Sequence, residues 1–244
     1  MIITLTTDIG WEYAAEMKGV IYSINPNVTI VDVTHDIQPQ NIRQGAFVLY
    51  CIAPYFKNAI HVGVVDPGVG TERKAIVIKT KNAWFIGPDN GLFWPAASRE
   101  GIEKIYELLF DDASPVFHGR DVFAPAAALI SAGKKPKWKE IDNMKKLEFP
   151  EAITEGNKIV ARIIYIDKFG NMITNAIVKG KKKIRIKIGE KTMKIRCLPS
   201  YGYAEKGEII AVGSSTGFTE IAMREGNAAK YFNAKEDDVV EIFL

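Results

Sequence analysis

The chain has 244 residues, enough for one large domain or for a medium domain with a smaller one. A formal net charge of +3 gives no general attraction to nucleic acid, and no apolar run reaches the length of a membrane span. The N-terminus lacks the basic region of a signal peptide, and Cys51 and Cys197 form no metal or redox motif. We therefore expect a cytoplasmic protein without nucleic-acid or membrane partners.

The first part of the chain, up to about residue 133, alternates strand-like and helix-like segments. β-branched and apolar runs predict strands at 1–7, 28–34, 59–66, 74–80 and 83–89. Helical spacing predicts helices at 12–24, 41–56 and 121–133. This alternation is typical of an α/β layer with a mostly parallel sheet.

Residues 134–157 are polar and charged, as in a connector, and the pattern then changes to short strands separated by turns. These strands are expected at 158–167, 173–178, 182–188, 191–197, 207–213 and 238–244. The pattern suits a small all-β barrel or sandwich. We predict an N-terminal α/β domain over residues 1–150, which includes the connector from about 134, and a C-terminal β domain over 151–244.

The string "VVDPGVGTERK" at 64–74 ends an apolar run in Asp66 and then turns through glycines toward Arg73. It matches neither a Walker loop nor the three-glycine dinucleotide fingerprint. We expect the turn to swing Arg73 back toward Asp66. Asp8 and Asp66 both lie at the carboxyl ends of predicted strands, which is where ligands bind in parallel sheets. The structural alternative is a surface ion pair worth about 0–1 kcal/mol.

The string "FHGRDVFAP" at 117–125 places His118 before an apolar helix. In the structural alternative, Asp121 or Gly119 caps this helix and His118 only decorates a loop. The chain has three scattered histidines and no serine motif of a hydrolase elbow, so a zinc site or a nucleophilic triad is poorly supported. A carboxylate, a guanidinium and an imidazole together suit the orientation or deprotonation of water.

Two strings in the second half also carry candidate polar groups. "YIDKFGNMITN" at 165–175 has Asp167 at a strand end and Asn171 after a Phe-Gly turn. This string forms either a plain hairpin or a purine site, in which the aromatic ring stacks on the purine and the amide of Asn171 binds an edge of its ring. "GSSTGFTEIA" at 213–222 supplies Ser215 for a carboxylate, or forms an ordinary loop. The basic run "KGKKKIRIKI" is more typical of a solubilised edge strand than of a nucleic-acid site.

Taken in order, "LTTDIG", "THDIQPQNIRQGAFVL", "VVDPGVGTERK", "GPDNGLF", "FHGRDVFAPAAA", "IDKFGN" and "GSSTGFTEIAMREGNAA" resemble one family over nearly the whole chain. The family is the adenosine-forming S-adenosyl-L-methionine hydrolases, also called SAM hydroxide adenosyltransferases, which are related to fluorinases and chlorinases. The resemblance implies a C-terminal β-barrel and a homotrimer with sites between neighbouring subunits. It implies hydrolysis of S-adenosyl-L-methionine to adenosine and L-methionine, with no cofactor and no metal.

The resemblance also implies roles for single residues. Asp66, Arg73 and His118 correspond to the water-handling set that the halogenating relatives lack, and Asp8 corresponds to the residue that binds the ribose diol. The substrate-binding positions in the second half are Asp167, Asn171, Ser215 and Glu220. Asp167 and Ser215 match the methionine-binding positions, and Asn171 matches the adenine position.

The chain departs from the family pattern in the loop after Asp8, which is short and leaves the roles of Glu12 and Tyr13 open. Thr216 follows Ser215 where a fluorinase has arginine. Two alternatives accompany the hydrolase interpretation. One is a halide-dependent S-adenosylmethionine halogenase, and the other is a non-catalytic adenosine-binding protein.

Overall fold

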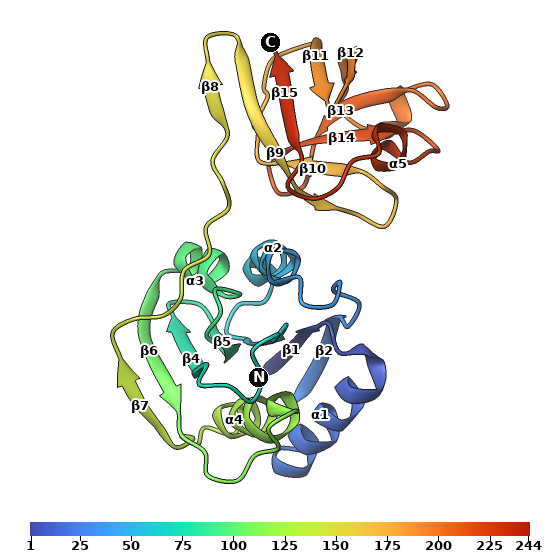
Figure 1. Cartoon of the computed structure of the whole chain (residues 1–244). Helices are drawn as coiled ribbons and strands as arrows, with labels where there is room; N and C mark the ends of the chain where they lie inside the picture. Colours follow the sequence, from blue (N-terminus) through green and yellow to red (C-terminus); the bar gives the residue numbers. More distant parts are fainter. The chain divides into compact units, whose positions relative to one another are not determined.

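The structure, a computed structural model, describes all 244 residues. The chain forms two compact units, Met1–Glu148 and Phe149–Leu244, and each unit has its own β-sheet (Figure 1). None of the helices combines the length and the apolar character that a membrane crossing requires.

The first unit is a seven-stranded sheet of order β2-β1-β3-β5-β4-β6-β7, with helices on both faces (Figure 1). Its strands are β1 (Ile2–Thr7), β2 (Thr29–Thr34), β3 (Ile60–Val64), β4 (Ala75–Thr80), β5 (Trp84–Pro88), β6 (Ile102–Leu108) and β7 (Trp138–Ile141). Its helices are α1 (Gly10–Ile24), α2 (Ile42–Ile52), the 3₁₀ turn η1 (Ala53–Tyr55), α3 (Trp94–Glu100), the π-helical turn η2 (Gly119–Phe123) and α4 (Ala124–Ser131). The predicted α/β fold is confirmed.

Four neighbouring strands, β2, β1, β3 and β5, run parallel. Leu5 of β1 lies opposite Val62 of β3, and Val62 lies opposite Ile86 of β5, so the carboxyl ends of these strands meet at one edge of the sheet. The apolar side chains of this part pack against Met17 and Ile21 of α1 and against α4. This core fixes the positions of the loops that leave the carboxyl edge.

The other three strands, β4, β6 and β7, add an antiparallel side to the sheet. The sequence did not predict β6 or β7, and β7 lies inside the segment expected to be a connector. The reason is their charged side chains, which form the ion pairs Lys79–Glu103, Lys104–Glu140 and Lys139–Glu107 between adjacent strands at 2.9 to 3.2 Å. The charged residues interrupt the two-residue alternation by which a half-buried strand is recognised in a sequence.

The second unit is a β-barrel, as the resemblance implied. Its strands are β8 (Ile153–Glu155), β9 (Lys158–Ile166), β10 (Met172–Thr174), β11 (Lys183–Ile188), β12 (Lys191–Cys197), β13 (Ile209–Gly213), β14 (Thr219–Met223) and β15 (Val239–Phe243). The order β10-β14-β13-β12-β11-β15-β9 closes through the pairing of β9 with β10, and β8 extends β9 outside the ring. The 3₁₀ turn η3 (Tyr201–Tyr203) and the short helix α5 (Ala228–Phe232) lie between strands.

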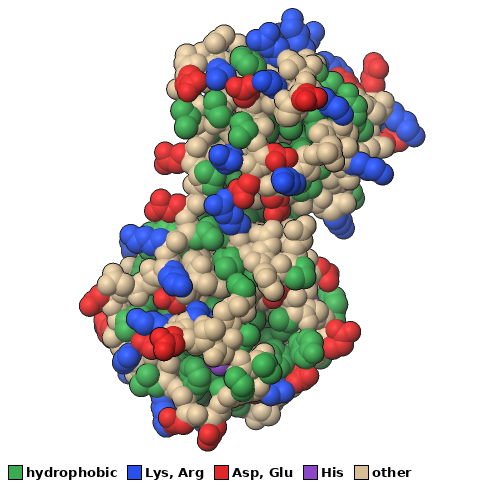
Figure 2. Space-filling view, in the orientation of Figure 1, with side chains coloured by type: hydrophobic (Ala, Val, Ile, Leu, Met, Phe, Trp, Pro, Cys, Tyr) green, Lys and Arg blue, Asp and Glu red, His purple; other side chains and the backbone are tan.

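The basic strand β11 is not an edge strand, because it pairs with β12 on one side and β15 on the other. Its isoleucines are buried in the barrel, while Lys183, Arg185 and Lys187 are exposed on the outer face. Figure 2 shows Lys and Arg side chains over the part of the second unit that holds β11 and β12. The alternation seen in the sequence therefore reflects the inside and outside of a barrel rather than a protected edge.

Candidate active site

Asp66 and Arg73 form a tight ion pair at the carboxyl edge of the first sheet. Asp66 lies two residues beyond the end of β3, and the glycine turn that follows returns the chain so that Arg73 faces it. Arg73 donates from Nε to Oδ1 of Asp66 at 3.2 Å and from Nη2 to Oδ2 at 2.5 Å. The side chains are only 4% and 5% exposed, so this is a buried bidentate pair and not the exposed ion pair of the structural alternative.

His118 completes the cluster from a distant part of the chain. Its Nδ1 lies 3.0 Å from Nη2 of Arg73, and it precedes the π-helical turn η2 that leads into α4. The imidazole contacts the ring of Phe110 edge-on at 5.1 Å, and the guanidinium of Arg73 lies 5.5 Å from the ring centre of Phe123. The structure thus brings Asp66, Arg73 and His118 together between aromatic rings.

Asp121 does not cap the helix that follows His118, and no other side chain caps η2 or α4. Its carboxylate instead accepts hydrogen bonds from the backbone N–H of Ser114 at 2.9 Å and from Arg120 at 2.7 Å. These bonds tie the loop before His118 to the turn after it. The structural alternative, in which Asp121 or Gly119 caps this helix, was therefore wrong, because the π-helical turn carries the chain straight into α4.

The hydrogen bond between Arg73 and His118 fixes which imidazole nitrogen carries the proton. A guanidinium only donates, so Nδ1 of His118 accepts and the proton of the neutral ring is on Nε2. Burial lowers the pKa of His118, and the charge of Arg73 lowers it further. Burial raises the pKa of Asp66, although Arg73 opposes that rise. The cluster therefore holds a neutral imidazole beside a carboxylate with increased proton affinity.

Asp8 directly follows β1, the strand that pairs with β3. Its N–H donates to the carbonyl of Val64 at 3.2 Å, which extends the pairing of β1 with β3 beyond the strands. Its Oδ2 accepts the N–H of Gln40 at 2.8 Å. Asp8 and Asp66 thus leave adjacent parallel strands at the same edge, as their positions after predicted strands indicated.

The short loop after Asp8 enters α1 directly at Gly10, so Glu12 lies in the first turn of that helix. Tyr13 is 54% exposed, and its ring packs edge-on against Phe117 at 5.3 Å. Phe117 is the residue before His118. Tyr13 therefore lies beside the loop that carries the imidazole.

In the second unit, Asp167 and Asn171 form one closed turn between β9 and β10. Oδ1 of Asp167 accepts the N–H groups of Phe169 and Asn171, and Oδ2 accepts the side-chain amide of Asn171, each at 2.9 Å. Asn171 is buried, whereas the ring of Phe169 is 63% exposed. The turn leaves an exposed aromatic face next to a fixed amide, which suits a flat ligand.

Glu220 lies on β14 opposite Ile173 of β10. It is buried, and Oε1 accepts a hydrogen bond from the hydroxyl of Tyr201 at 2.5 Å. Burial raises the pKa of Glu220, the bond from Tyr201 opposes the rise, and the nearby charge of Asp167 adds to it. Ser215 lies in the turn between β13 and β14, where its side chain is exposed.

Comparison with known proteins assigns the chain to a family. The sequence profiles of the N-terminal and C-terminal domains of SAM hydroxide adenosyltransferase match residues 3–140 and 161–241. The chain belongs to the SAM hydroxide adenosyltransferase family.

Similar proteins span the full chain. A protein of Methanocaldococcus jannaschii named (R)-S-adenosyl-L-methionine hydrolase is 41% identical over 99% of this chain and 95% of its own length. A fluorinase of Nocardia brasiliensis is 24% identical over 99% of this chain and 96% of its own length. The crystal structure of an uncharacterized conserved protein from Thermotoga maritima matches with a TM-score of 0.93 at 34% identity, with complete coverage of both chains.

In this member of the family, the candidate residues fall into one group in each unit. The first unit holds Asp8, Asp66, Arg73 and His118, and the second holds Asp167, Asn171, Ser215 and Glu220. Sequence reasoning missed the residues that support them. Tyr201 lies in a turn with no recognisable pattern, whereas Asn90 lies in the "GPDNG" string, which marks a turn after a strand and was a usable signal.

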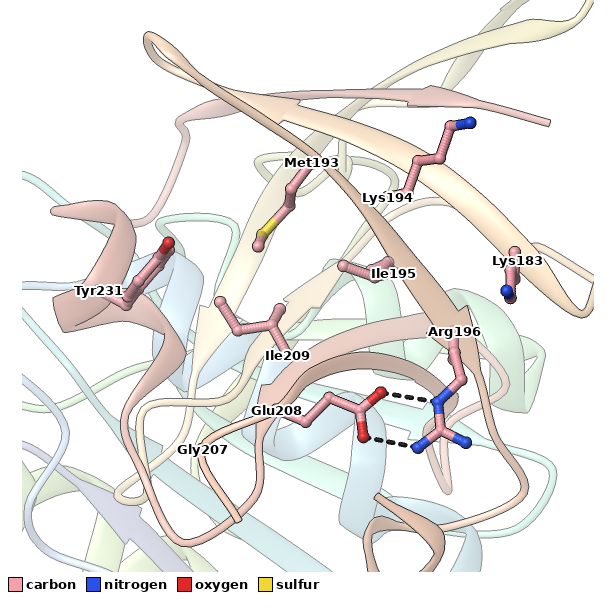
Figure 3. A pocket seen from close by; sticks show the side chains of 9 residues that line it. All are labelled: Lys183, Met193, Lys194, Ile195, Arg196, Gly207, Glu208, Ile209 and Tyr231. Atoms are coloured by element: carbon pink, nitrogen blue, oxygen red, sulfur yellow. Dashed lines mark hydrogen bonds and ion pairs between the residues drawn. The ribbon is translucent and has the colours of Figure 1, made fainter. Parts of the chain in front are cut away.

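Each of the two units has a hollow on its surface. One of about 390 Å³ in the second unit is floored by Met193, Ile195 and Ile209, with Tyr231 on one side and the paired Arg196 and Glu208 on the other (Figure 3). It contains no candidate residue. Another, of about 620 Å³, is lined in part by Arg73, Asp89 and Lys145. No group of three or more His, Cys, Asp or Glu side chains is placed to hold a metal ion.

Proposed function

We propose that this chain hydrolyses S-adenosyl-L-methionine to adenosine and L-methionine. The observation that carries this proposal is the position of the Arg73 guanidinium, with Nη2 at 2.5 Å from Oδ2 of Asp66 and 3.0 Å from Nδ1 of His118. The relatives named (R)-S-adenosyl-L-methionine hydrolase support the same substrate, and the fluorinases are more distant in sequence.

In the proposed reaction, the oxygen of water attacks C5′ of the ribose in line with the C5′–S bond. The new C–O bond forms as the C–S bond breaks, and the electron pair of that bond leaves on sulfur as a neutral thioether. The attacking water loses one proton, so the products are adenosine, methionine and H⁺. Because the sulfonium needs no protonation to leave, the protein has to supply alignment and a proton acceptor for the water.

We assign the proton to Asp66 and the orientation of the water to His118. The imidazole accepts from Arg73 through Nδ1, so its remaining nitrogen, Nε2, carries hydrogen and can only donate to the water oxygen. The carboxylate oxygens of Asp66 accept from Arg73 and still have lone pairs for a water proton. The raised pKa of Asp66 strengthens it as a base.

Arg73 then has two functions in the proposal. It fixes the carboxylate by two parallel hydrogen bonds, and its charge keeps the imidazole neutral by lowering the pKa of His118. A positive charge at this place also favours hydroxide character on the water as its proton moves to Asp66.

For substrate binding we propose that Asp8 holds the ribose diol, while the second unit holds the rest of the molecule. Asp167 and Ser215 would bind the methionine part and Asn171 the adenine, with Glu220 completing this group. We further propose a cytoplasmic homotrimer in which each site takes residues from two subunits. The proposal requires no cofactor and no metal.

Chromatography of purified protein incubated with S-adenosyl-L-methionine tests this function. We expect adenosine and methionine in equal amounts, and a loss of rate on the order of 10²- to 10⁴-fold in Asp66→Ala and His118→Ala. Asp111→Ala removes an exposed carboxylate from the same unit and should retain wild-type activity.

The same assay separates the alternatives. A 5′-halogenated nucleoside that forms on addition of chloride or fluoride would identify a halogenase. Tight binding of adenosine with no product beyond the uncatalysed background would identify a binding protein. Either result would replace the hydrolase proposal.

A further inference from the structure

The turn after β5 supports the Asp66–Arg73 pair, although none of its residues belongs to that pair. The parallel register of β3 with β5 runs from Ile60 opposite Trp84 to Val62 opposite Ile86 and ends there. β5 closes with Pro88, which has no N–H to donate to a neighbouring strand. Beyond this point the backbone carbonyls that lead from β3 to Asp66 need another hydrogen-bond donor.

Asn90 supplies that donor. Its Nδ2 donates to the carbonyl of Val65 at 2.8 Å, and Val65 is the residue before Asp66. Its Oδ1 accepts the N–H of Leu92 at 3.1 Å, which fixes the amide so that Nδ2 points at β3. On the other side of β3, the N–H of Asp8 donates to the carbonyl of Val64. The carbonyls of Val64 and Val65, the last two before Asp66, therefore accept hydrogen bonds from residues that follow β1 and β5, the strands on either side of β3.

The same turn also contacts the partner of Asp66. The N–H of Asp89 donates to the carbonyl of Lys74 at 2.9 Å, and this carbonyl also accepts from Nη1 of Arg73 at 3.1 Å. Adjacent residues of one turn thus hold the backbone beside Asp66 and the carbonyl that orients the guanidinium. A structural turn would need only the bond between Asn90 and Leu92.

We propose that Asn90 is a positioning residue that fixes the Asp66 carboxylate against Arg73 and His118. The inference rests on the proposed hydrolysis. If the amide is removed, the Val65 carbonyl loses its donor and the segment that carries Asp66 can shift relative to Arg73. Small displacements of aligned groups are costly to the chemical step and less so to substrate binding.

The test compares Asn90→Ala with a chemically matched control, Asn25→Ala. Asn25 makes a comparable pair of contacts at the end of α1, with Oδ1 accepting the N–H of Asn27 and Nδ2 donating to the hydroxyl of Ser131. We expect kcat for adenosine release to fall roughly 10- to 100-fold in Asn90→Ala, with KM within about twofold. The control should keep both constants, even where its melting temperature falls.

The pH profile gives a readout that a purely structural role would not move. Arg73 and His118 are the charged or titratable groups that face Asp66, and Arg73 restrains the rise in its pKa. A loosened pair should move the acid limb of kcat/KM to higher pH in Asn90→Ala and leave it in place in the control. Asn90→Asp keeps an acceptor for Leu92 but has no donor for Val65, and it serves if the alanine variant does not fold.

The outcomes separate this inference from the function on which it rests. If the wild type is active and both Asn90 variants keep its kcat and acid limb, Asn90 is only a structural residue and the hydrolase proposal stands. A wild type that releases no adenosine would remove both proposals. Loss of kcat at unchanged KM, with a shifted acid limb, supports the positioning role.

Discussion

The imidazole of His118 turns an accepting nitrogen toward Arg73, and this makes its role testable by one substitution. His118→Gln places an N–H donor near the position of Nε2 but cannot take up a proton at neutral pH. If His118 orients the water by donation, we expect the glutamine variant to retain activity within about tenfold of wild type, while His118→Ala loses on the order of 10²-fold or more. Steady-state rates of adenosine release measure the difference.

The pH dependence of the same variants shows which group titrates. Asp66 has a pKa raised above its ordinary 3.8, so the rate should fall on the acid side, starting above that value, as the carboxylate takes up a proton. His118 has a pKa lowered from 6.5, so it stays neutral through that value and should produce no limb there. The acid limb should remain in His118→Gln. A limb near 6.5 that disappears in this variant would make His118 the base instead.

Contacts between single residues were predictable where the chain itself brings them close. The glycine turn indicated that Arg73 returns to Asp66, and the structure contains that contact. The approach of His118 to Arg73 spans 45 positions and depends on how α4 packs on the sheet, so the residues alone could not give it. The bond between Tyr201 and Glu220 likewise depends on how the turn before β13 packs against β14.

At the scale of the element, the turn that joins β3 to β4 has two glycines with different requirements. Gly70 has a φ of +75°, and a Cβ there would lie 2.2 Å from the carbonyl oxygen of Pro115 in the loop before His118. Gly70→Ala should lower the free energy of unfolding by about 2 kcal/mol or more and reduce kcat, because the turn and that loop must separate. Chemical denaturation and adenosine release measure the two effects.

Gly68 is the matched control in the same turn. A Cβ there meets nothing closer than 3.5 Å, and its φ is not in the left-handed region. Gly68→Ala should change the free energy of unfolding by less than about 1 kcal/mol and leave kcat unchanged. Equal losses in both variants would mean that the turn needs general flexibility rather than close contact with Pro115.

Whole elements were predictable where apolar residues recur at a regular spacing on one face of the element. The parallel strands and α1, α2 and α4 follow from such patterns, whereas β6, β7 and β14 do not. β6 and β7 carry charged side chains that pair across the two strands, and β14 lies in a Ser- and Gly-rich string that resembles a loop. These strands form because they pair with neighbouring strands, and their own composition does not indicate that pairing.

For the whole molecule, the proposed trimer makes a prediction about mixed assemblies. If each site takes its water-handling group from one subunit and its methionine- and adenine-binding group from a neighbour, then Asp66→Ala and Asp167→Ala inactivate opposite halves of a site. Each variant alone should be inactive. In a closed ring with heterologous contacts, co-expression of the two should restore up to about a quarter of the wild-type rate, because that fraction of sites combines two intact halves.

The mass of the assembly is the companion measurement, and three copies of the 27.1 kDa chain are expected by light scattering. A control mixture of Asp66→Ala with His118→Ala should stay inactive, because both changes damage the same half and no combination of subunits repairs it. A trimer whose Asp66→Ala and Asp167→Ala mixture also stays inactive would place each complete site within one subunit. Restored activity, by contrast, requires that residues of two subunits meet at the substrate, since neither variant retains an intact set of its own.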